Sequence, residues 1–475
     1  MKNTFVRTGR LVAVLAVALA LVSSPVMADV ISWDGASAGS WATATNWSGD
    51  VVPGASDDVV LGAPAAGGTY TLGGDWTINS LTINVKPYLN AAANTLNIAS
   101  GNITTGGTWS YGGFTAKVAI PSNTNATWTL SHSSDQFEMG AIIADSTVTI
   151  TKAGAKKLTL TADNSTTLHA NWLVNAGSVN PKASNAFGDG MVTFGLNTAV
   201  TFSINNGTYA NNWNLNGNTV QFNPSAGNTS YTTTLTGNIT GSGILDRHNL
   251  TSGGGDGTLF LAGTANTFTG DMRFTRGNMV LNGTFTGLGN ITQTAGGTTT
   301  LAGAGTVGMG LDKKLTVTGT SGTTPIAANL APGSNIAAGT IGTLTVGTAG
   351  NNNSIDLKSY SRFLVDVDAT SSDLLALTGT LNLNFTNNAL YITGVLGSST
   401  SYTLATFTAT DGGKFAQVFF NGTDITTVAE TANGVGGTHQ LVYGTTSLTL
   451  VPEPATMALL VLGGMGLLAR RRNRA

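Results

Sequence analysis

Apolar and small polar residues alternate along most of this chain, in short segments that end at glycine- or asparagine-rich turns. Residues 77–85, 146–150 and 315–319 are clear examples, with Ile, Leu or Val largely alternating with Thr, Asn or Ser. A period of two places successive side chains on opposite faces, so each segment is expected to be a strand with one buried face. We find no convincing amphipathic helix between Asp29 and Val451. The body is therefore predicted to be all-β.

Pairs of these segments recur along the chain. Residues 157–161 lead to 173–179, and residues 258–263 lead to 274–281, with Asn164 and Asn266 at corresponding positions between them. Strand pairs that repeat without helices predict stacked coils of a parallel β-helix, or β-solenoid, in which each coil buries its inward side chains on the next. Residues 402–450 are expected to form a final antiparallel sheet, which would protect the last coil from edge-to-edge association.

These copies resemble the autotransporter-associated β-strand repeat, in which a Gly-Thr-Leu strand, an Asn turn with an aromatic residue and a glycine, and a second strand follow one another. Residues 257–281 fit this pattern best, whereas Leu168-His169-Ala170 replaces the aromatic-Thr-Gly of the turn in the first copy. The resemblance implies a right-handed parallel β-helix. It also implies that the tryptophan-rich residues 31–47 cap the first coil and that residues 330–375 belong to a closing stretch.

The first residues of the chain have the order of a secretory signal peptide. Three basic residues precede the unbroken apolar stretch 11–22, and small residues follow as far as Ala28. This order predicts export through the Sec machinery, with cleavage between Ala28 and Asp29. The alternative is a signal-anchor helix that is never cut.

The last residues combine a short motif, an apolar run and a basic end: Val451, Pro452, Glu453 and Pro454 precede residues 455–469, which are followed by Arg470, Arg471, Arg472 and Arg474. Pro454 suits the first position of a helix. At about 1.5 Å per residue the apolar run would reach about 22 Å, less than a hydrocarbon core of about 30 Å. Spanning would need local thinning or snorkelling arginines, which would stay in the cytoplasm. The alternative is a C-terminal core helix.

This three-part tail resembles a PEP-CTERM sorting signal. The resemblance implies a Gram-negative-type bacterium in which an exosortase processes the protein at the motif. The protein would pass through an inner-membrane intermediate, held by the C-terminal helix, to the cell surface or extracellular matrix. The predicted organisation is thus a signal peptide (1–28), an N-terminal β region with a tryptophan-rich cap (29–145), a β-solenoid with repeats (146–310), a C-terminal β region (311–450) and a sorting signal (451–475).

The amino-acid composition excludes several kinds of site and partner. The chain has no cysteine, which excludes disulfides, thiolate catalysis and thiolate metal sites. Charged residues make up 9% and hydrophobic residues 41%, so the chain is expected to fold rather than stay disordered. Between residues 29 and 450 the charge is about eight units negative, because 22 acidic residues face 14 basic ones. Nucleic-acid binding would need the opposite sign.

Acidic residues are the better candidates for a site. Asp366 and Asp368 alternate with valines, so both are expected to point away from the apolar face, and together with Asp373 they are weak candidates for calcium ligands. Asp57 and Asp58 follow Pro53-Gly54 and are expected to form a polar turn. Otherwise no metal or cofactor is predicted.

Other chemistry-bearing residues are scattered. The four histidines lack metal-ligand spacing and are expected on the surface or in turns: His132, His169, His248 and His439. The charged tripeptide 246–248 is expected on a solvated turn. Residues 253–257 are similar to a calcium-binding nonapeptide repeat but occur once, so a loop is expected.

Three functions are compatible with the sequence. The leading interpretation is a non-enzymatic structural or adhesive surface protein. The second is a carbohydrate-active β-helix enzyme, a polysaccharide lyase or hydrolase, whose carboxylates would have to converge on one face. The third is a glycan-binding module that uses large aromatic residues as stacking platforms, although in a weakly charged β protein such residues more often lie in the core: Trp109, Trp128, Trp172 and Trp213.

Overall fold

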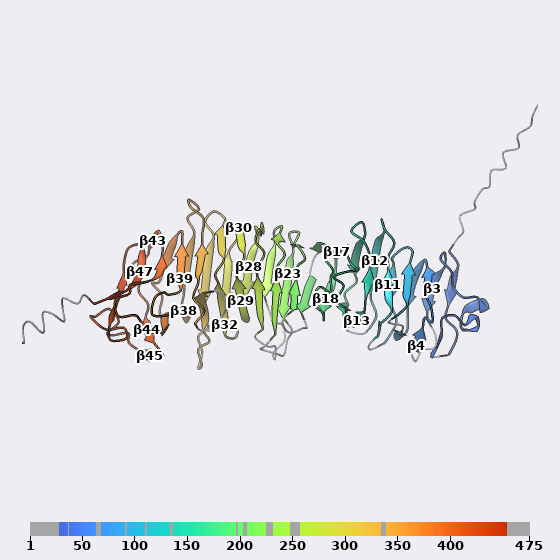
Figure 1. The fold of residues 1–475 in the computed structure, drawn as a ribbon, viewed down its shortest axis with the longest axis horizontal. Coiled ribbons are helices and arrows are strands. Elements are labelled where there is room, and N and C mark those ends of the chain that lie inside the picture. The colour runs from blue at the N-terminus through green and yellow to red at the C-terminus, as the bar shows by residue number, and fades with distance from the viewer. Residues whose placement is uncertain are drawn as a thin grey trace, which may run out of the picture.

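The chain folds into one elongated stack of β-coils (Figure 1). The computed structural model describes residues 28–36, 38–62, 68–90, 93–109, 112–133, 136–195, 198–202, 207–224, 231–247, 257–333 and 339–453. Within these ranges the elements are strands, apart from two short 3-10 turns at Ala44–Asn46 and Ser48–Asp50. Strands of successive coils pair in parallel through most of the molecule. The predicted all-β solenoid is confirmed, and its right-handed sense stays a prediction.

The first half of the stack has three faces. Sheet I has the order β1 (Val30–Ser32), β3 (Asp58–Leu61), β6 (Ser80–Ile83), β9 (Ile103–Thr105), β12 (Asn125–Leu130), β15 (Thr149–Ala153), β17 (Asn171–Val174), β19 (Val192–Phe194), β22 (Trp213–Asn214) and β25 (Ile239–Thr240). A short sheet III stacks β5 (Trp76–Ile78), β8 (Thr95–Ile98), β11 (Lys117–Ala119) and β14 (Ile142–Ile143).

Sheet II runs through both halves of the stack and has 16 strands. Its order is β2 (Ala38–Ser40), β4 (Gly68–Thr71), β7 (Pro87–Asn90), β10 (Gly112–Phe114), β13 (Gln136–Met139), β16 (Lys157–Leu160), β18 (Gly177–Pro181), β20 (Thr198–Phe202), β23 (Thr219–Pro224), β26 (Ile244–Arg247), β28 (Asp271–Phe274), β31 (Ile291–Thr294), β34 (Lys314–Thr318), β37 (Ser354–Leu357), β40 (Thr380–Asn382) and β43 (Ala409–Thr410).

Two further sheets form the other faces of the second half. Sheet IV stacks β21 (Gly207–Tyr209), β24 (Thr232–Leu235), β27 (Thr258–Leu261), β29 (Gly277–Leu281), β32 (Thr299–Gly303), β35 (Ala328–Pro332), β38 (Ser361–Val367), β41 (Ala389–Gly394), β44 (Gln417–Phe420) and β45 (Thr423–Asp424). Sheet V stacks β30 (Thr284–Leu288), β33 (Thr306–Met309), β36 (Thr343–Val346), β39 (Leu374–Leu377), β42 (Tyr402–Thr406), β47 (Ser447–Pro452) and β46 (His439–Tyr443).

The alternating pattern in the sequence corresponds directly to burial. In β12, Ala126, Trp128 and Leu130 are buried, while the residues between them are more exposed. Because the coils stack in register, each inward side chain packs on its equivalents in the coils before and after. The apolar interior therefore forms one continuous core along the described length of the stack.

Both ends of the stack are covered. Trp33, Trp41 and Trp47 are buried at the first coil, with the rings of Trp33 and Trp41 edge-on to Trp47 at centroid distances of 4.9 Å and 4.7 Å. At the other end β42 and β46 both pair antiparallel with β47. The tryptophan cluster and the final antiparallel sheet thus lie at the two ends of the described stack, where the sequence predicts them.

The asparagines that align in the two repeats occupy equivalent buried positions between coils. Oδ1 of Asn164 accepts a hydrogen bond from the Ile142 amide (3.0 Å), and its Nδ2 donates to the Ala186 carbonyl (2.8 Å). Oδ1 of Asn266 likewise accepts from the Ile239 amide (2.8 Å). Each side chain satisfies backbone groups that the turn would otherwise leave unpaired.

Candidate functional site

The described residues of the predicted sorting motif belong to the C-terminal sheet. Val451 and Pro452 end strand β47 and lie opposite Gln440 and His439 of β46. The strand therefore extends two residues beyond the boundary predicted at 450/451. This placement joins the start of the motif to the folded body without a linker.

Glu453 is also held by the cap. Its amide donates to the Thr438 carbonyl (3.1 Å), and its Oε1 accepts from the Asn433 amide (3.3 Å). Pro454 and the remainder of the predicted sorting signal lie outside the described residues, including Arg470, Arg471, Arg472 and Arg474. The described fold thus includes the first three residues of the motif, Val451 to Glu453.

The predicted cleavage point for the signal peptide lies just before the first strand. Ala28 and Asp29 are exposed, and the Asp29 carbonyl accepts a hydrogen bond from the Asp58 amide (2.8 Å). Residues 1–27 lie outside the described part, so cleavage stays a prediction. In the described ranges, no helix has the length and apolar character needed to cross a bilayer.

The three calcium candidates lie near one another but bind backbone groups. Asp373 is buried; its Oδ1 accepts from the Gly342 amide (2.9 Å) and its Oδ2 from the Asp366 amide (3.0 Å). Burial raises the pKa of Asp373 to about 7, against the lowering effect of these two hydrogen bonds. Asp366 accepts from the Gly339 amide (2.6 Å).

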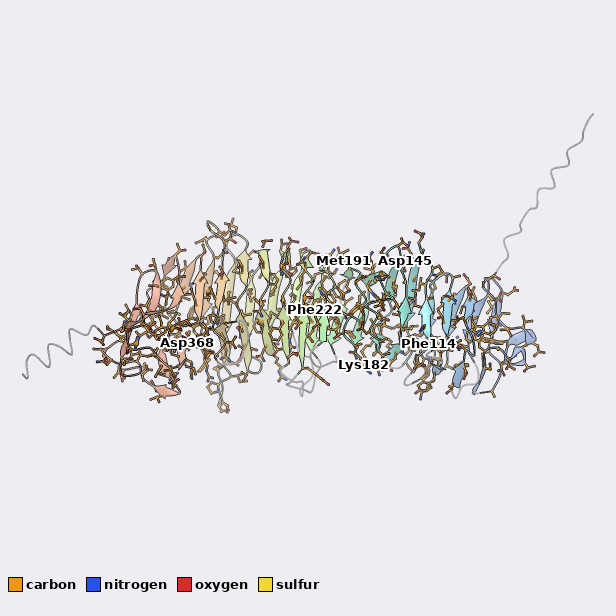
Figure 2. The ribbon with its side chains drawn as sticks, viewed as in Figure 1. Phe114, Asp145, Lys182, Met191, Phe222 and Asp368 are labelled. Carbon is orange, nitrogen blue, oxygen red and sulfur yellow. The ribbon has the colours of Figure 1, made fainter. Side chains whose placement is uncertain are left out.

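Asp368 is exposed and closes a turn near the C-terminal end of the stack (Figure 2). Its carboxylate accepts from the amides of Thr370 and Ser371, both at 2.7 Å, and these bonds lower its pKa to about 2. The described residues contain no group of three or more His, Asp or Glu side chains arranged to hold a metal ion. Asp366, Asp368 and Asp373 thus remain candidate calcium ligands only, and a calcium titration would test them.

The aspartate pair near the N-terminus forms local contacts. Asp57 accepts a hydrogen bond from the Gly54 amide (2.7 Å), as expected for a polar turn. Asp58 instead begins β3, and its carboxylate accepts from Asn79 Nδ2 of the next coil (2.7 Å). These two carboxylates thus stabilise a turn and a coil-to-coil contact.

The expectation that the histidines lie on the surface or in turns is wrong for His439, whereas His132 lies in the bend between β12 and β13 but is buried there. His132 is fully buried and stacks on Trp109 with centroids 4.0 Å apart, and its Nδ1 lies 2.6 Å from the Thr105 hydroxyl oxygen, which gives the buried ring a polar partner. Burial lowers the pKa of His132 to about 4, so its ring is neutral at pH 7. His439 is buried in β46, and its Nε2 lies 2.8 Å from the Thr400 carbonyl oxygen. His248 lies outside the described residues.

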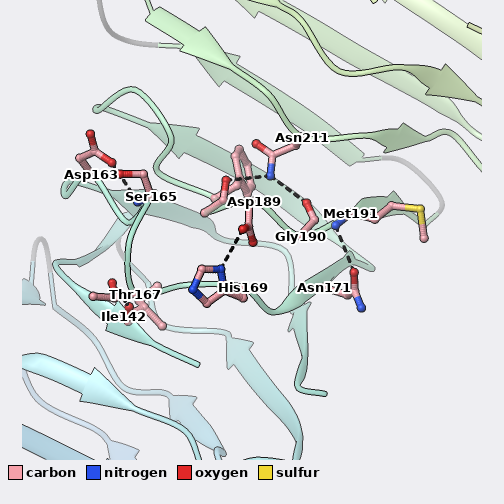
Figure 3. A network of polar contacts seen from close by, with 12 residues as sticks. Ile142, Asp163, Ser165, Thr167, His169, Asn171, Asp189, Gly190, Met191 and Asn211 are labelled. Carbon is pink, nitrogen blue, oxygen red and sulfur yellow. Dashed lines mark hydrogen bonds and ion pairs between the residues drawn. The ribbon is translucent and has the colours of Figure 1, made fainter. Parts of the chain in front are cut away.

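His169 forms the most catalytic-looking pair, with its Nδ1 2.8 Å from Oδ2 of Asp189 on the neighbouring coil (Figure 3). The hydroxyl of the neighbouring Thr167 donates to the Ile142 carbonyl (2.7 Å), and Asp163 accepts from the Ser165 amide (2.9 Å). The contacts of His169 and Thr167 connect adjacent coils, and that of Asp163 closes a local turn. The pair is therefore explained as part of the coil-to-coil network.

The four tryptophans considered as glycan platforms are core residues. Trp109, Trp128, Trp172 and Trp213 are at most 6% exposed. Trp128 of β12 and Trp172 of β17 pack edge to face inside the stack, with centroids 5.7 Å apart. None of these four rings offers a face to a ligand.

Asp246 and Arg247, the described residues of the charged tripeptide, do not lie on a solvated turn. Asp246 and Arg247 lie in strand β26 and are buried. Asp246 forms an ion pair with Arg273 on the next coil (3.0 Å), and Nη2 of Arg247 donates to the Gly257 carbonyl (2.9 Å). The expectation fails because a charged residue in a strand can face inward where a turn supplies carbonyl acceptors.

Comparison with known proteins adds one finding. Residues 450–472 match the PEP-CTERM protein-sorting motif. The match confirms the interpretation of the tail and includes Val451–Pro454 together with Arg470–Arg472. No curated protein and no solved structure matches the chain. The motif implies an exported protein that is anchored in the membrane before an exosortase processes it.

Proposed function

We propose that this protein is a non-enzymatic structural or adhesive component of the cell surface or extracellular matrix of a Gram-negative-type bacterium. In this proposal the Sec machinery exports the chain, the signal peptide is removed after Ala28, and the C-terminal helix holds an inner-membrane intermediate. An exosortase then acts at Val451–Pro454 and passes the solenoid outward.

The observation that carries this proposal is the junction at the end of the body. The sorting motif begins inside strand β47, so the folded stack and its processing site are contiguous. Before processing, the whole cap would therefore lie close to the membrane. A long, capped β-stack held in this way suits a protein whose extended surface is the functional part.

Two further features support the same interpretation. The carboxylates considered for catalysis or calcium accept hydrogen bonds from backbone amides, as in a structural protein. The equivalent bonding of Asn164 and Asn266 favours a true repeat, and we infer that these coils are of the autotransporter-associated type and right-handed.

The test compares the full chain with a chain that lacks residues 454–475, each carrying an epitope tag in an exposed turn. This deletion keeps Glu453 and the complete strand β47, so the cap can still form. The full chain is expected at the cell surface in processed form, and the deletion variant in the periplasm or medium. Surface display of the deletion variant would contradict the proposal.

A further inference from the structure

A hollow of about 400 Å³ opens on the outer face of sheet IV, between strands β38, β41 and β44. This volume is typical of small-ligand sites, which range over about 300–1,000 Å³. In-register positions of the three strands place Arg362, Ala389 and Gln417 in one row across the sheet. A depression forms in this row because the small side chain of Ala389 lies between the long, exposed side chains of Arg362 and Gln417.

Two residues at the rim of the hollow have positive φ angles, which non-glycine residues rarely adopt. Tyr360 and Asn387 lie one coil apart and both have positive φ angles, 58° and 59°. The Tyr360 amide donates to the Asn387 carbonyl (3.1 Å). A bulky residue with positive φ is a genuine outlier, and such strain is concentrated at binding sites. Gly319 makes room for it, since a β-carbon there would lie 2.4 Å from that of Tyr360.

The hollow contains one positively charged group, the guanidinium of Arg362, which is oriented by an aromatic ring. The guanidinium carbon of Arg362 lies 5.1 Å from the centre of the Tyr391 ring, and Tyr391 stacks on Phe419 at 4.4 Å. A cation–π contact of this kind orients the guanidinium without neutralising it. No acidic side chain is among the described residues that line the hollow.

We propose that this hollow binds an acidic sugar unit, a uronate of an extracellular polysaccharide. The Arg362 guanidinium matches a sugar carboxylate in bidentate geometry. The amides of Asn387 and Gln417 are suited to hydroxyl groups, since each both donates and accepts. The rings of Tyr360 and Tyr391 supply the apolar part of the wall.

The balance of these groups favours a sugar over other anions. One cation among uncharged amides and phenol rings matches a single carboxylate surrounded by hydroxyls, whereas a phosphate carries more charge than one guanidinium neutralises. The proposal goes beyond the sorting function and needs only the folded body. A chain that binds no sugar could still be sorted through its tail, and a chain that is not sorted could still bind the sugar.

The test is calorimetric titration of the purified full chain in mild detergent with tetragalacturonate and, separately, with maltotetraose as a neutral tetrasaccharide. We expect binding of the acidic sugar alone. Arg362→Gln should weaken it at least about tenfold, because a charge-assisted contact is lost. Ala389→Leu, which fills the hollow, should have a similar effect. The matched control is Arg276→Gln, which removes an arginine from a turn outside the hollow and should leave affinity unchanged.

Three results would overturn the proposal. The first is no heat of binding with tetragalacturonate, and the second is unchanged affinity in both hollow variants while circular dichroism shows that they fold. The third is equal competition by inorganic phosphate or polyglutamate, which would identify a general anion site instead of a sugar site.

Discussion

A β-carbon on Gly177 would lie 2.6 Å from Nζ of Lys152, a buried lysine of the preceding coil. That ammonium group faces the core and donates to the Ala176 carbonyl (2.7 Å). Arg247 and Gly277 repeat the arrangement, with a distance of 2.5 Å to Nη2. Both glycines have a φ of 69°. At both places a glycine that begins a strand makes room for an inward cation.

Gly177→Ala should therefore lower the free energy of unfolding by two effects. One is the strain of a positive φ on alanine, and the other is the crowding around the new methyl group. The new methyl would crowd both Lys152 and the Ala155 carbonyl oxygen, which would lie 2.7 Å away. We expect a loss of about 2–3 kcal/mol in urea unfolding. Gly437→Ala is the matched control, because Gly437 has a φ of 74° and open space around its β-position. Equal losses in the two variants would show that the crowding has no effect.

Lys152 should make stability depend on alkaline pH. Burial lowers its pKa from 10.5 to about 8, so between these values the unfolded chain binds a proton that the folded chain does not. Stability contributed by this group should therefore rise from about pH 8 to pH 10, by on the order of 3 kcal/mol. Lys152→Met should remove this rise in the free energy of unfolding. If the free energy of unfolding of the variant rises with pH as steeply as that of the wild type, other groups cause the pH dependence.

Asp373 should make the protein less stable as the pH rises from about 4 to about 7, opposite to the effect of Lys152. Its pKa is raised by burial to about 7, so the folded chain holds a proton more tightly than the unfolded chain. The contribution of this group to stability is present at about pH 4 and is lost as pH rises to about 7. Asp373→Asn should flatten the melting temperature over this range. Asp368→Asn, an exposed control, should keep the decline.

The same melting experiment tests calcium binding. The carboxylates of Asp366, Asp368 and Asp373 already accept backbone hydrogen bonds, so millimolar calcium should leave the melting temperature unchanged. A rise that Asp373→Asn abolishes would instead establish a calcium site.

Asn266 should contribute more to stability than an exposed asparagine. Its side chain bonds the Ile239 amide and the Thr284 carbonyl across stacked coils, and the Gly263 carbonyl within its own turn. Asn266→Ala would leave the Ile239 amide buried and unpaired, because the Gly263 and Thr284 carbonyls keep the backbone amides of Thr284 and Asn266 as donors. The expected cost is about 2 kcal/mol in urea unfolding. Asn384→Ala, at an exposed position, should cost less than about 0.5 kcal/mol. Similar values for both would contradict the clamping role of Asn266.

Truncation of the tail should have two distinct effects. Removing residues 454–475 should leave the melting temperature unchanged, because the described cap ends at Glu453. Removing residues 451–475 should lower it, since Val451 and Pro452 pair with β46 and Glu453 bonds Thr438. Differential scanning calorimetry would detect the difference. Equal melting temperatures would show that the end of β47 is not part of the stable cap.

Local patterns were sufficient to predict much of the architecture. Alternation over a few residues identifies a strand such as β12 wherever it lies, because period-two burial is a property of the strand itself. The repeat of Asn164 and Asn266 indicated stacked coils, and the order of motif, apolar run and arginines identified the tail, since each signal is contiguous in the chain.

The hollow and the buried ionisable groups could not be predicted in this way. Arg362, Ala389 and Gln417 become neighbours only because three coils stack in register. Lys152 is polar by type and yet faces the core, because a glycine of the next coil leaves space for it.

The sequence by itself therefore determined that this protein is a capped stack of β-coils with a sorting tail, because period-two alternation and the tail motif are local properties. Only the tertiary structure decided which side chains meet across coils, where charges are buried and where the surface is hollowed. Those properties depend on the register between coils, which no single segment of the chain encodes.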